Sequence, residues 1–341
     1  MSHTFFSFSA LFYKLKPQFM KLKIIVSNQT NPFVNIAVEQ HLVAENPSDT
    51  IVMYLWKNHR TVVVGLNQNP YSECDVDALL AEGGHVMRRL TGGGAVYHDT
   101  GNLNFSFVVP KAYYDVARQF SVIQKAVESF GLSTEVSGRN DLLCEGRKFS
   151  GNAFSKGRDN SLHHGTILIK TNTADIQRFL KVKPTKLQKH GVASVKSRVV
   201  NLSELADITS ENIVTPLVEA FCSVYGGKAE EVPFEAVCTE EVMAHSRSLA
   251  SDDFLFAKWR NFRTRCNGSF PWGEVEIALE TDETTHTISR VEIATDCLSL
   301  AAVEQARQLL QGASLSQPPQ IPASDNDTEA IVKDIIALVY G

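Results

Sequence analysis

The pattern of apolar and polar positions predicts short strands and helices mixed along the chain. Strand-like apolar runs and helix-like spacings of three and four follow one another without a regular strand–helix alternation. We therefore expect an α+β fold with a large mixed sheet rather than a doubly wound one. The runs at 50–58 and 60–69 flank a short polar turn, which predicts a hairpin. The predicted strands lie at 20–27, 50–58, 60–69, 85–90, 102–110 and 165–170, and the predicted helices at 31–46, 75–84 and 115–131.

A polar and acidic stretch at 228–253 interrupts this pattern, and we expect a domain join within it. The first domain would cover residues 20–246 and the second, smaller domain residues 251–341. In the second domain, strands are predicted at 270–281 and 285–296, followed by two helices on either side of a Pro/Ser-rich loop. The polar join is compatible with hinge motion, so the small domain is expected to act as a mobile lid.

Residues 1–19 differ from the rest of the chain, since they are rich in aromatic side chains and contain no acid. Lys14 and Lys16 follow the apolar residues, whereas a secretory signal carries its positive charge before them. The segment is also poorer in arginine than a mitochondrial transit peptide. We expect a dispensable extension ahead of an alternative start at Met20. The expected location is the cytoplasm, or the mitochondrial matrix in a eukaryote.

Composition excludes several classes of protein. The chain has 341 residues, of which 43% are hydrophobic and 21% charged, with a formal net charge of −5. This weak acidity argues against a protein that coats nucleic acid, and no apolar run approaches the roughly 20 residues that span a bilayer. The six cysteines are scattered without a CxxC pair, which disfavours a zinc site and suits reduced thiols in a reducing compartment.

The segment RRLTGGGAVYHD, residues 88–99, is the first candidate for chemistry. It matches neither a Walker A loop nor GxGxxG. Bare glycine N–H groups beside an arginine nevertheless suit an anionic ligand. A tight turn between two strands, capped by His98 and Asp99, explains the same residues equally well.

The segment SGRNDLLCEGRKFSGNAF, residues 137–154, is the second candidate. A hairpin-like turn at 145–146 precedes an alternating pattern that would direct Lys148 and Ser150 to one face. Small residues nearby leave room for a ligand. Asp141 suits either a role in holding Mg²⁺ or an ordinary turn, and the sequence does not decide between them.

Two further segments complete the set. In LHHGTILI, residues 162–169, Thr166 can donate a hydrogen bond into a site, and no third ligand lies at metal spacing from the two histidines. Between residues 178 and 198 every charged side chain is basic. That stretch is either a solvated basic loop or a loop that closes over phosphates. It lacks the interleaved aromatics on which the bases of nucleic acids stack.

Taken together and in this order, the four segments resemble the lipoate–protein ligases, in their bacterial two-domain form. The resemblance runs from about Met20 to the C-terminus and is weaker after residue 250. It implies a biotin/lipoate ligase-like catalytic domain with a small accessory domain. It also implies that ATP and Mg²⁺ activate lipoate to lipoyl-AMP, and that the lipoyl group then passes to a lysine. The implied acceptors are the lipoyl domains of 2-oxoacid dehydrogenase E2 subunits and the glycine cleavage H protein. A monomer that binds neither nucleic acid nor membrane is expected.

The same resemblance assigns residues. Lys148 is implied as the catalytic lysine that contacts the carbonyl and phosphate of the adenylate, and the metal ligands stay unassigned. The implied lipoate- and ATP-binding residues are Arg89, Gly92, Gly93, Gly94, Ala95, Val96, Tyr97, His98, Asn140, Asp141, Gly151, His164, Thr166, Lys196 and Arg198. The glycines would let the backbone lie against the lipoyl chain and the nucleotide.

A similar pocket could serve other functions. An acyltransferase that forms a thioester needs a thiolate near the acyl carbon. No cysteine follows the HHGT segment closely, because the next is Cys222. A lipoyltransferase that uses preformed lipoyl-AMP would keep the same pocket and stays open. A non-catalytic binder of acyl-nucleotide or nucleic acid is disfavoured by the presence of Lys148 with the whole glycine segment.

Overall fold

The computed structural model describes residues 20–138, 140–181, 199–259, 262, 264–282 and 284–341. The predictions made for residues 1–19, Lys196 and Arg198 lie outside this part of the chain. Within it, no helix is long and apolar enough to cross a membrane.

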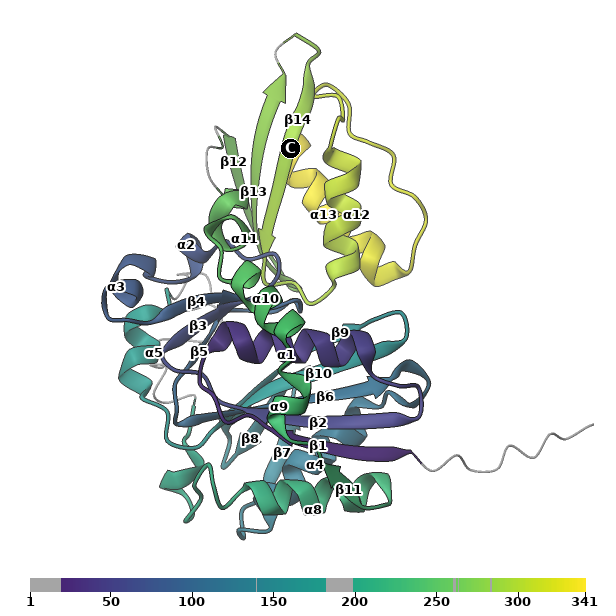
Figure 1. Ribbon diagram of the computed structural model, residues 1–341. Helices are drawn as coiled ribbons and strands as arrows, with labels where there is room; N and C mark the ends of the chain where they lie inside the picture. Colours follow the sequence, from purple (N-terminus) through teal and green to yellow (C-terminus); the bar gives the residue numbers. More distant parts are fainter. Residues whose placement is uncertain (1–19, 139, 182–198, 260–261, 263, 283) are drawn as a thin grey trace, which may run out of the picture.

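An eight-stranded mixed sheet forms the centre of the molecule (Figure 1). The predicted α+β architecture is confirmed. In spatial order the strands are β11 (Ala229–Glu231), β1 (Lys21–Val26), β2 (Thr50–Trp56), β6 (Asn102–Pro110), β10 (Asn160–Leu168), β9 (Arg147–Lys156), β8 (Asp141–Cys144) and β7 (Thr134–Ser137). Strands β1 and β2 run parallel, as do β1 and β11, and the other neighbours run antiparallel.

Helices cover both faces of this sheet, and alternate residues of each strand face opposite layers. On one face, Met53 and Phe107 pack with residues of α4 (Val116–Glu128) and α8 (Val214–Tyr225). On the other face, Val52 and Tyr54 pack with α1 (Pro32–Glu45) and α10 (Glu240–Leu249). Because both faces are covered, β2 is buried along its whole length and is a continuous apolar run in the sequence.

A three-stranded sheet lies beside the large one. It consists of β4 (His85–Arg88), β3 (Thr61–Val64) and β5 (Val96–His98). The predicted hairpin between 50–58 and 60–69 is therefore wrong: β2 pairs with β1 and β6, whereas β3 pairs with β4 and β5. The segment 89–95, which we call the glycine loop, connects β4 to β5. Short helices α2 (Pro70–Glu73), α3 (Val76–Ala81) and α5 (Thr173–Phe179) lie nearby.

The C-terminal part forms the two predicted strands and the two predicted helices, together with one strand before them that was not predicted. Strands β12 (Thr264–Phe270), β13 (Gly273–Asp282) and β14 (Thr287–Thr295) make an antiparallel sheet with its own core against α12 (Leu300–Leu310) and α13 (Asn326–Tyr340). Helices α9 (Phe234–Val237) and α11 (Asp252–Phe256) flank α10 in the chain. Residue 246 lies inside α10, and the division of the chain into two domains there stays a prediction.

The C-terminal sheet is tied to the loops around the small sheet by polar contacts. The Ser72 hydroxyl donates to Glu276 Oε2 at 2.8 Å, and the Thr295 N–H donates to the Asn67 carbonyl at 3.0 Å. The Gly93 N–H donates to the Cys297 carbonyl at 3.4 Å. The last of these contacts joins the C-terminal part directly to the glycine loop.

Candidate active site

A row of neighbouring residues crosses five strands of the large sheet. Trp56 on β2 lies opposite Asn104 on β6, and Asn104 lies opposite Thr166 on β10. The Thr166 hydroxyl accepts a hydrogen bond from the Gly151 N–H of β9 at 3.1 Å, and Gly151 lies opposite Asp141 of β8. Directly opposed residues place their side chains on the same face of a sheet. The row therefore forms one continuous surface, from an indole to a carboxylate.

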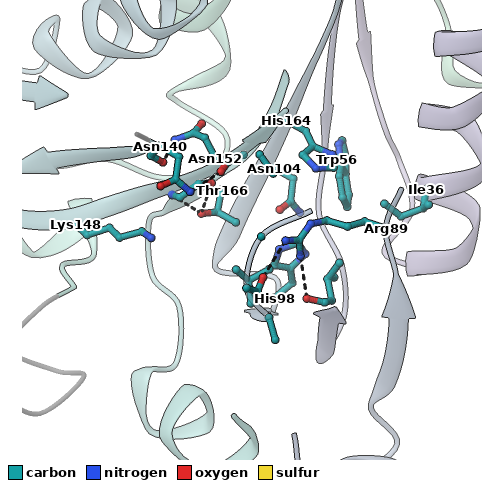
Figure 2. Close-up of a pocket in the computed structure, with 18 residues that line it drawn as sticks. Ile36, Trp56, Arg89, His98, Asn104, Asn140, Lys148, Asn152, His164 and Thr166 are labelled. Carbon is teal, nitrogen blue, oxygen red and sulfur yellow. Dashed lines mark hydrogen bonds between the residues drawn. The ribbon is translucent and has the colours of Figure 1, made fainter. Parts of the chain in front are cut away.

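A cavity of about 150 Å³ lies on this surface (Figure 2). That volume is several times the roughly 30 Å³ that one water molecule occupies in the liquid, so it suits an organic ligand. Lys148 lies at one end of the cavity, and Trp56 and Ile36 lie at the other. The arrangement combines a cation with an apolar chamber, as a ligand with an anionic head and an apolar tail requires.

The ammonium of Lys148 is held at the end of the cavity by an ion pair. Its Nζ lies 2.7 Å from Asp141 Oδ1, and both side chains are about one-third exposed, at 34% and 33%. The residue Gly151 leaves the space that this ammonium occupies, because a Cβ built there would lie 2.9 Å from both Cε and Nζ of Lys148. The turn predicted at 145–146 is confirmed, with φ of 51° at Glu145 and 70° at Gly146.

The sheet register shifts between Leu142 and Leu143 on β8, so Ser150 pairs with Leu142 and Lys148 with Leu143. One extra residue on β9, Phe149, is accommodated in the core. As a result the cavity is lined by Lys148 and Gly151, and Ser150 is not among its lining residues. The prediction that Lys148 and Ser150 lie on the same face is wrong, because it assumed a strand without a bulge.

Arg89 acts inside the glycine loop. Its Nη2 donates to the carbonyls of Gly92 at 2.7 Å and Gly94 at 2.9 Å, and its Nε donates to the Thr91 hydroxyl at 2.9 Å. Burial of this guanidinium lowers its pKa to about 10. Although Arg89 lines the cavity, its donors are largely committed to the loop. It therefore shapes the wall that a ligand meets.

The three consecutive glycines have different surroundings. Gly93 has a φ of +90°, which favours glycine, and with Gly94 it lines the cavity. Gly92 instead faces the C-terminal part, where a Cβ would lie 2.4 Å from the Cys297 carbonyl oxygen. Close approach to a ligand thus fits Gly93 and Gly94. At Gly92 the missing side chain makes room for the protein's own backbone.

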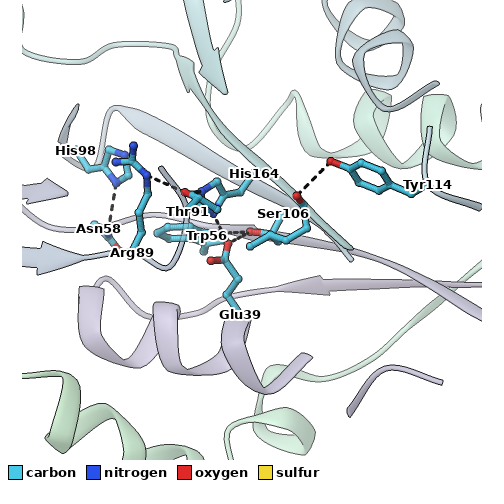
Figure 3. Close-up of polar contacts among 10 residues, drawn as sticks. Glu39, Trp56, Asn58, Arg89, Thr91, His98, Ser106, Tyr114 and His164 are labelled. Carbon is cyan, nitrogen blue, oxygen red and sulfur yellow. Dashed lines mark hydrogen bonds and ion pairs between the residues drawn. The ribbon is translucent and has the colours of Figure 1, made fainter. Parts of the chain in front are cut away.

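A buried network connects the loop to helix α1 (Figure 3). His164 Nε2 lies 2.8 Å from the Thr91 hydroxyl, and His164 Nδ1 lies 2.9 Å from Glu39 Oε2. Thr91 also accepts from Arg89, so both ring nitrogens of His164 are engaged, one by the loop and the other by Glu39. Glu39 also accepts from the Ser106 hydroxyl, which in turn accepts from the Trp56 indole. The chain of contacts fixes the position of several cavity walls at once.

His98 is buried on the opposite wall, at 4% exposure. Burial, together with the positive charge of Arg89 and the neighbouring His164, lowers its pKa to about 3, so the ring is neutral at ordinary pH. Its Nδ1 lies 3.3 Å from Asn58 Nδ2, and its Nε2 has no hydrogen-bond partner in the described part of the chain. The centroid of its ring lies 6.0 Å from the centroid of the Trp56 ring, in a T-shaped arrangement.

The structure brings most of the predicted site residues together. Of those, the described residues that line the cavity are Arg89, Gly93, Gly94, Ala95, Val96, His98, Asn140, Lys148, Gly151, His164 and Thr166. Asp141 contacts the cavity through Lys148. Tyr97 is not a lining residue: it is buried, and its hydroxyl donates to Asp175 Oδ2 at 3.0 Å. Asp99 caps the following turn by accepting from the N–H groups of Gly101 and Asn172.

Several lining residues are not among those predicted from the sequence. They are Ile36, Trp56, Val63, Asn104, Asn152, Ala153 and Gly165. A signal existed for one of them: Asn102, Asn104 and Ser106 alternate with apolar residues in a strand that otherwise looks like core. Polar side chains along one face of a central strand need partners there, and such a face indicates a site.

The positions of the cysteines and of possible metal-binding side chains bear on which chemistry the cavity supports. None of the six cysteines, all of which lie in the described part of the chain, forms a disulfide, and none of them lines the cavity. Burial raises the pKa of Cys144, the cysteine nearest to Lys148 in sequence, which disfavours its thiolate. Among the described residues there is no cluster of three His, Cys, Asp or Glu side chains suited to a metal ion.

Comparison with known proteins identifies the family of this chain. Residues 31–222 match the family model of the lipoyl protein ligase A/B catalytic domain. The chain is 36% identical to lipoate-protein ligase A of Bdellovibrio bacteriovorus, over 86% of this chain and 88% of that protein. It is 35% identical to the protein of that name from Psychrobacter cryohalolentis, over 85% and 88%.

Solved structures show the same fold. The crystal structure of P. falciparum LipL1 in complex with lipoate superposes with a TM-score of 0.77 at 25% identity, covering 94% of this chain and 99% of that one. A lipoate-protein ligase A bound with ATP gives a TM-score of 0.59 at 23% identity, over 70% and 98%. The fold and the family match thus define a protein with a catalytic domain of the lipoyl protein ligase A/B type. The chain belongs to the lipoate–protein ligase A family.

Proposed function

We propose that this protein activates free lipoate with ATP and transfers the lipoyl group to a lysine of an acceptor protein. In the first step a lipoate carboxylate oxygen attacks the α-phosphorus, the bond to pyrophosphate breaks, and lipoyl-AMP forms. In the second step the acceptor amine attacks the acyl carbon, the acyl–oxygen bond breaks, and AMP leaves. The observation that carries this proposal is the Lys148 ammonium, fixed at the head of a chamber whose other end is apolar.

Both steps gather negative charge at the junction of carboxyl and phosphate. A preorganised cation and N–H donors aimed at that junction stabilise such charge more effectively than water does. Lys148 can supply the cation, and Asn140 and the bare loop backbone at Gly93 and Gly94 offer the polar wall beside it. The ion pair with Asp141 holds the ammonium in place until the substrate arrives. The network from Glu39 to Arg89 keeps the opposite wall in shape.

Mg²⁺ is proposed as a partner of ATP. It commonly binds proteins through one or two carboxylates, keeps several waters, and takes its remaining ligands from phosphate oxygens. Asp141, which is one-third exposed beside the cavity, is the carboxylate best placed for that arrangement. When bound, the ion would neutralise phosphate charge during displacement of pyrophosphate.

The proposed acceptors are lipoyl domains of 2-oxoacid dehydrogenase E2 subunits and the glycine cleavage H protein. Support comes from a solved archaeal lipoate protein ligase described together with its E2 lipoyl domain, which shares the fold at a TM-score of 0.60. Six cysteines that form no disulfide fit a reducing compartment such as the cytoplasm.

Release of pyrophosphate tests the proposal. The full chain is supplied with lipoate and MgATP and no acceptor, in parallel with Lys148→Ala and Lys148→Arg. We expect release by the wild type, a loss of about a hundredfold or more in Lys148→Ala, and partial recovery in Lys148→Arg. A silent wild type that still transfers supplied lipoyl-AMP would establish the alternative, a lipoyltransferase. No transfer in either assay would overturn both functions.

A further inference from the structure

Two buried polar groups in the cavity have no partner among the residues that the structure describes. One is Nε2 of His98 and the other is Nδ2 of Asn104, and these residues are 4% and 1% exposed. Both residues line the same cavity, among the apolar side chains Ile36, Trp56 and Val63. A buried donor left without an acceptor is costly. Two of them in one chamber indicate a ligand with acceptor atoms at that place.

The protonation of His98 follows from its neighbours. Asn58 has already used its Oδ1 to accept from Asn35, so its amide nitrogen faces His98 Nδ1. Nδ1 must then accept, and a neutral imidazole carries its proton on the other nitrogen. Nε2–H is therefore a donor.

Asn104 has a free amide atom in either orientation. Its Oδ1 accepts from Asn102 Nδ2 at 2.8 Å, which leaves Nδ2 without a partner. Rotating both amides by half a turn would let Asn104 donate to Asn102 and leave its oxygen unpaired. Because Asn102 Oδ1 is also unpaired in the present arrangement, neither choice satisfies Asn104 within the described ranges of the chain. A ligand with a group that both donates and accepts suits both orientations.

The sheet fixes how far this polar spot lies from Lys148. Asn104 on β6 is two strands away from Gly151 on β9, where the ammonium rests. Two strand spacings make about 10 Å. An extended chain advances about 1.2 Å per bond, so the far end of an eight-carbon acid lies roughly 8–9 Å from its carboxyl carbon. In lipoate, that far end carries the two ring sulfurs.

Resting on the proposed function, we propose that His98 and Asn104 form a polar subsite inside the acyl chamber, which selects an acyl chain with heteroatoms near C6 and C8 over a plain fatty acyl chain. The ring sulfurs of lipoate are weak acceptors that suit the Nε2–H of His98 and, in the orientation that leaves Nδ2 free, the amide of Asn104. Octanoate offers only C–H groups at the same place and leaves both donors unpaired. The rest of the chamber, lined by Trp56, Ile36 and Val63, supplies apolar contact to either acid.

Binding of three acids to the wild-type full chain tests the subsite without any variant. The acids are lipoate, octanoate and 8-hydroxyoctanoate, titrated by calorimetry. A purely apolar chamber would reject the hydroxyl, since burying it unpaired is unfavourable. The subsite predicts that 8-hydroxyoctanoate binds about tenfold more tightly than octanoate, with lipoate also tighter than octanoate. Weaker binding of 8-hydroxyoctanoate than of octanoate would overturn the inference.

The variant Asn104→Leu then removes one polar group at nearly constant volume. We expect the preference for 8-hydroxyoctanoate over octanoate to fall about tenfold, with octanoate bound as well as before or better. Ile36→Val is the matched control, because it reshapes the chamber without touching a donor and should change all three affinities in parallel. An unchanged ratio in Asn104→Leu would contradict the subsite, and if that variant does not fold, the wild-type series decides.

These measurements separate the two proposals. Binding affinities report on the subsite whether or not the protein releases pyrophosphate. A wild type that ranks the acids as expected but releases no pyrophosphate keeps the subsite and refutes ATP-dependent activation. Release of pyrophosphate with octanoate bound more tightly than its hydroxylated analogue does the reverse.

Discussion

Lys148 and Asp141 face each other across a two-stranded hairpin, with Nζ and Oδ1 2.7 Å apart at the mouth of the cavity. Because the pair is about one-third exposed, its contribution to stability is small, about 1 kcal/mol at most. Its value is in orienting the ammonium. We expect Asp141→Asn to lower the rate of pyrophosphate release about tenfold, with little change in melting temperature. Equal loss of rate and of folded protein would contradict this interpretation.

Gly151→Ala probes the space around the ammonium. The new methyl would lie 2.9 Å from Cε and Nζ of Lys148, which are the flexible end of a side chain that can move aside. We expect a change in unfolding free energy below about 1 kcal/mol but a fall in activity of tenfold or more, because the lysine leaves its position. Urea titration and pyrophosphate release measure the two effects. Full activity in a folded variant would show that the displaced lysine still reaches the substrate.

Gly92→Ala is the contrasting case. Its methyl would lie 2.4 Å from the carbonyl oxygen of Cys297, which belongs to backbone and cannot step aside. We expect this substitution to cost about 1–3 kcal/mol and to loosen the C-terminal part from the glycine loop. Limited proteolysis should cut the variant faster than wild type near residues 246–251. Unaltered proteolysis and stability would mean that the two backbones separate readily in solution.

Acid should destabilise the protein through its buried neutral histidines. Burial, aided by Arg89 and His164, lowers the pKa of His98 from 6.5 to about 3, and burial lowers the pKa of His163 well below 6.5. Below pH 6.5 these two histidines are protonated in the unfolded chain but not in the folded chain. Stability is therefore lost as pH falls from about 6.5 toward 3.

Each of these histidines contributes a slope that rises from about 0.7 kcal/mol per pH unit at pH 6.5 toward about 1.4 below roughly pH 5.5. Urea unfolding at about pH 7.5, 6.5 and 5.5 measures the slope, with His98→Asn as the comparison. The variant should lose roughly half of it. A flat profile between pH 6.5 and 5.5 in the wild type would show that the histidines are already protonated in the fold.

The order of strands and helices was largely predictable because apolar periodicity is a local property. Strand partners were not. The runs at 50–58 and 60–69 are close in sequence and look like a hairpin, yet β2 and β3 belong to different sheets. Which strand a β-run joins depends on the layers that cover it, and here most of the helices that bury β2, namely α4, α8 and α10, come from distant parts of the chain. Local sequence contains no record of those contacts.

The site was predictable where unusual residues cluster in sequence, as in the glycine loop and the segment around Lys148. It was not predictable where ordinary apolar residues converge from several elements, as Ile36, Trp56 and Val63 do. The sequence also does not show that adjacent residues have different roles. Arg88 is buried and donates to the carbonyls of Gly65 and Gln68, whereas Arg89 holds the glycine loop. Only the direction of each side chain separates the two roles.

The contact between Gly92 and Cys297 also limits how the chain can be recombined. A chimera that takes its C-terminal sheet from a relative must present a carbonyl at the same place, or the glycine loop loses the surface on which it rests. Grafts that exchange residues 90–94 together with the C-terminal part should assemble, while grafts that exchange either alone should fit poorly. The two segments should therefore be exchanged together, although some 200 residues of sequence separate them.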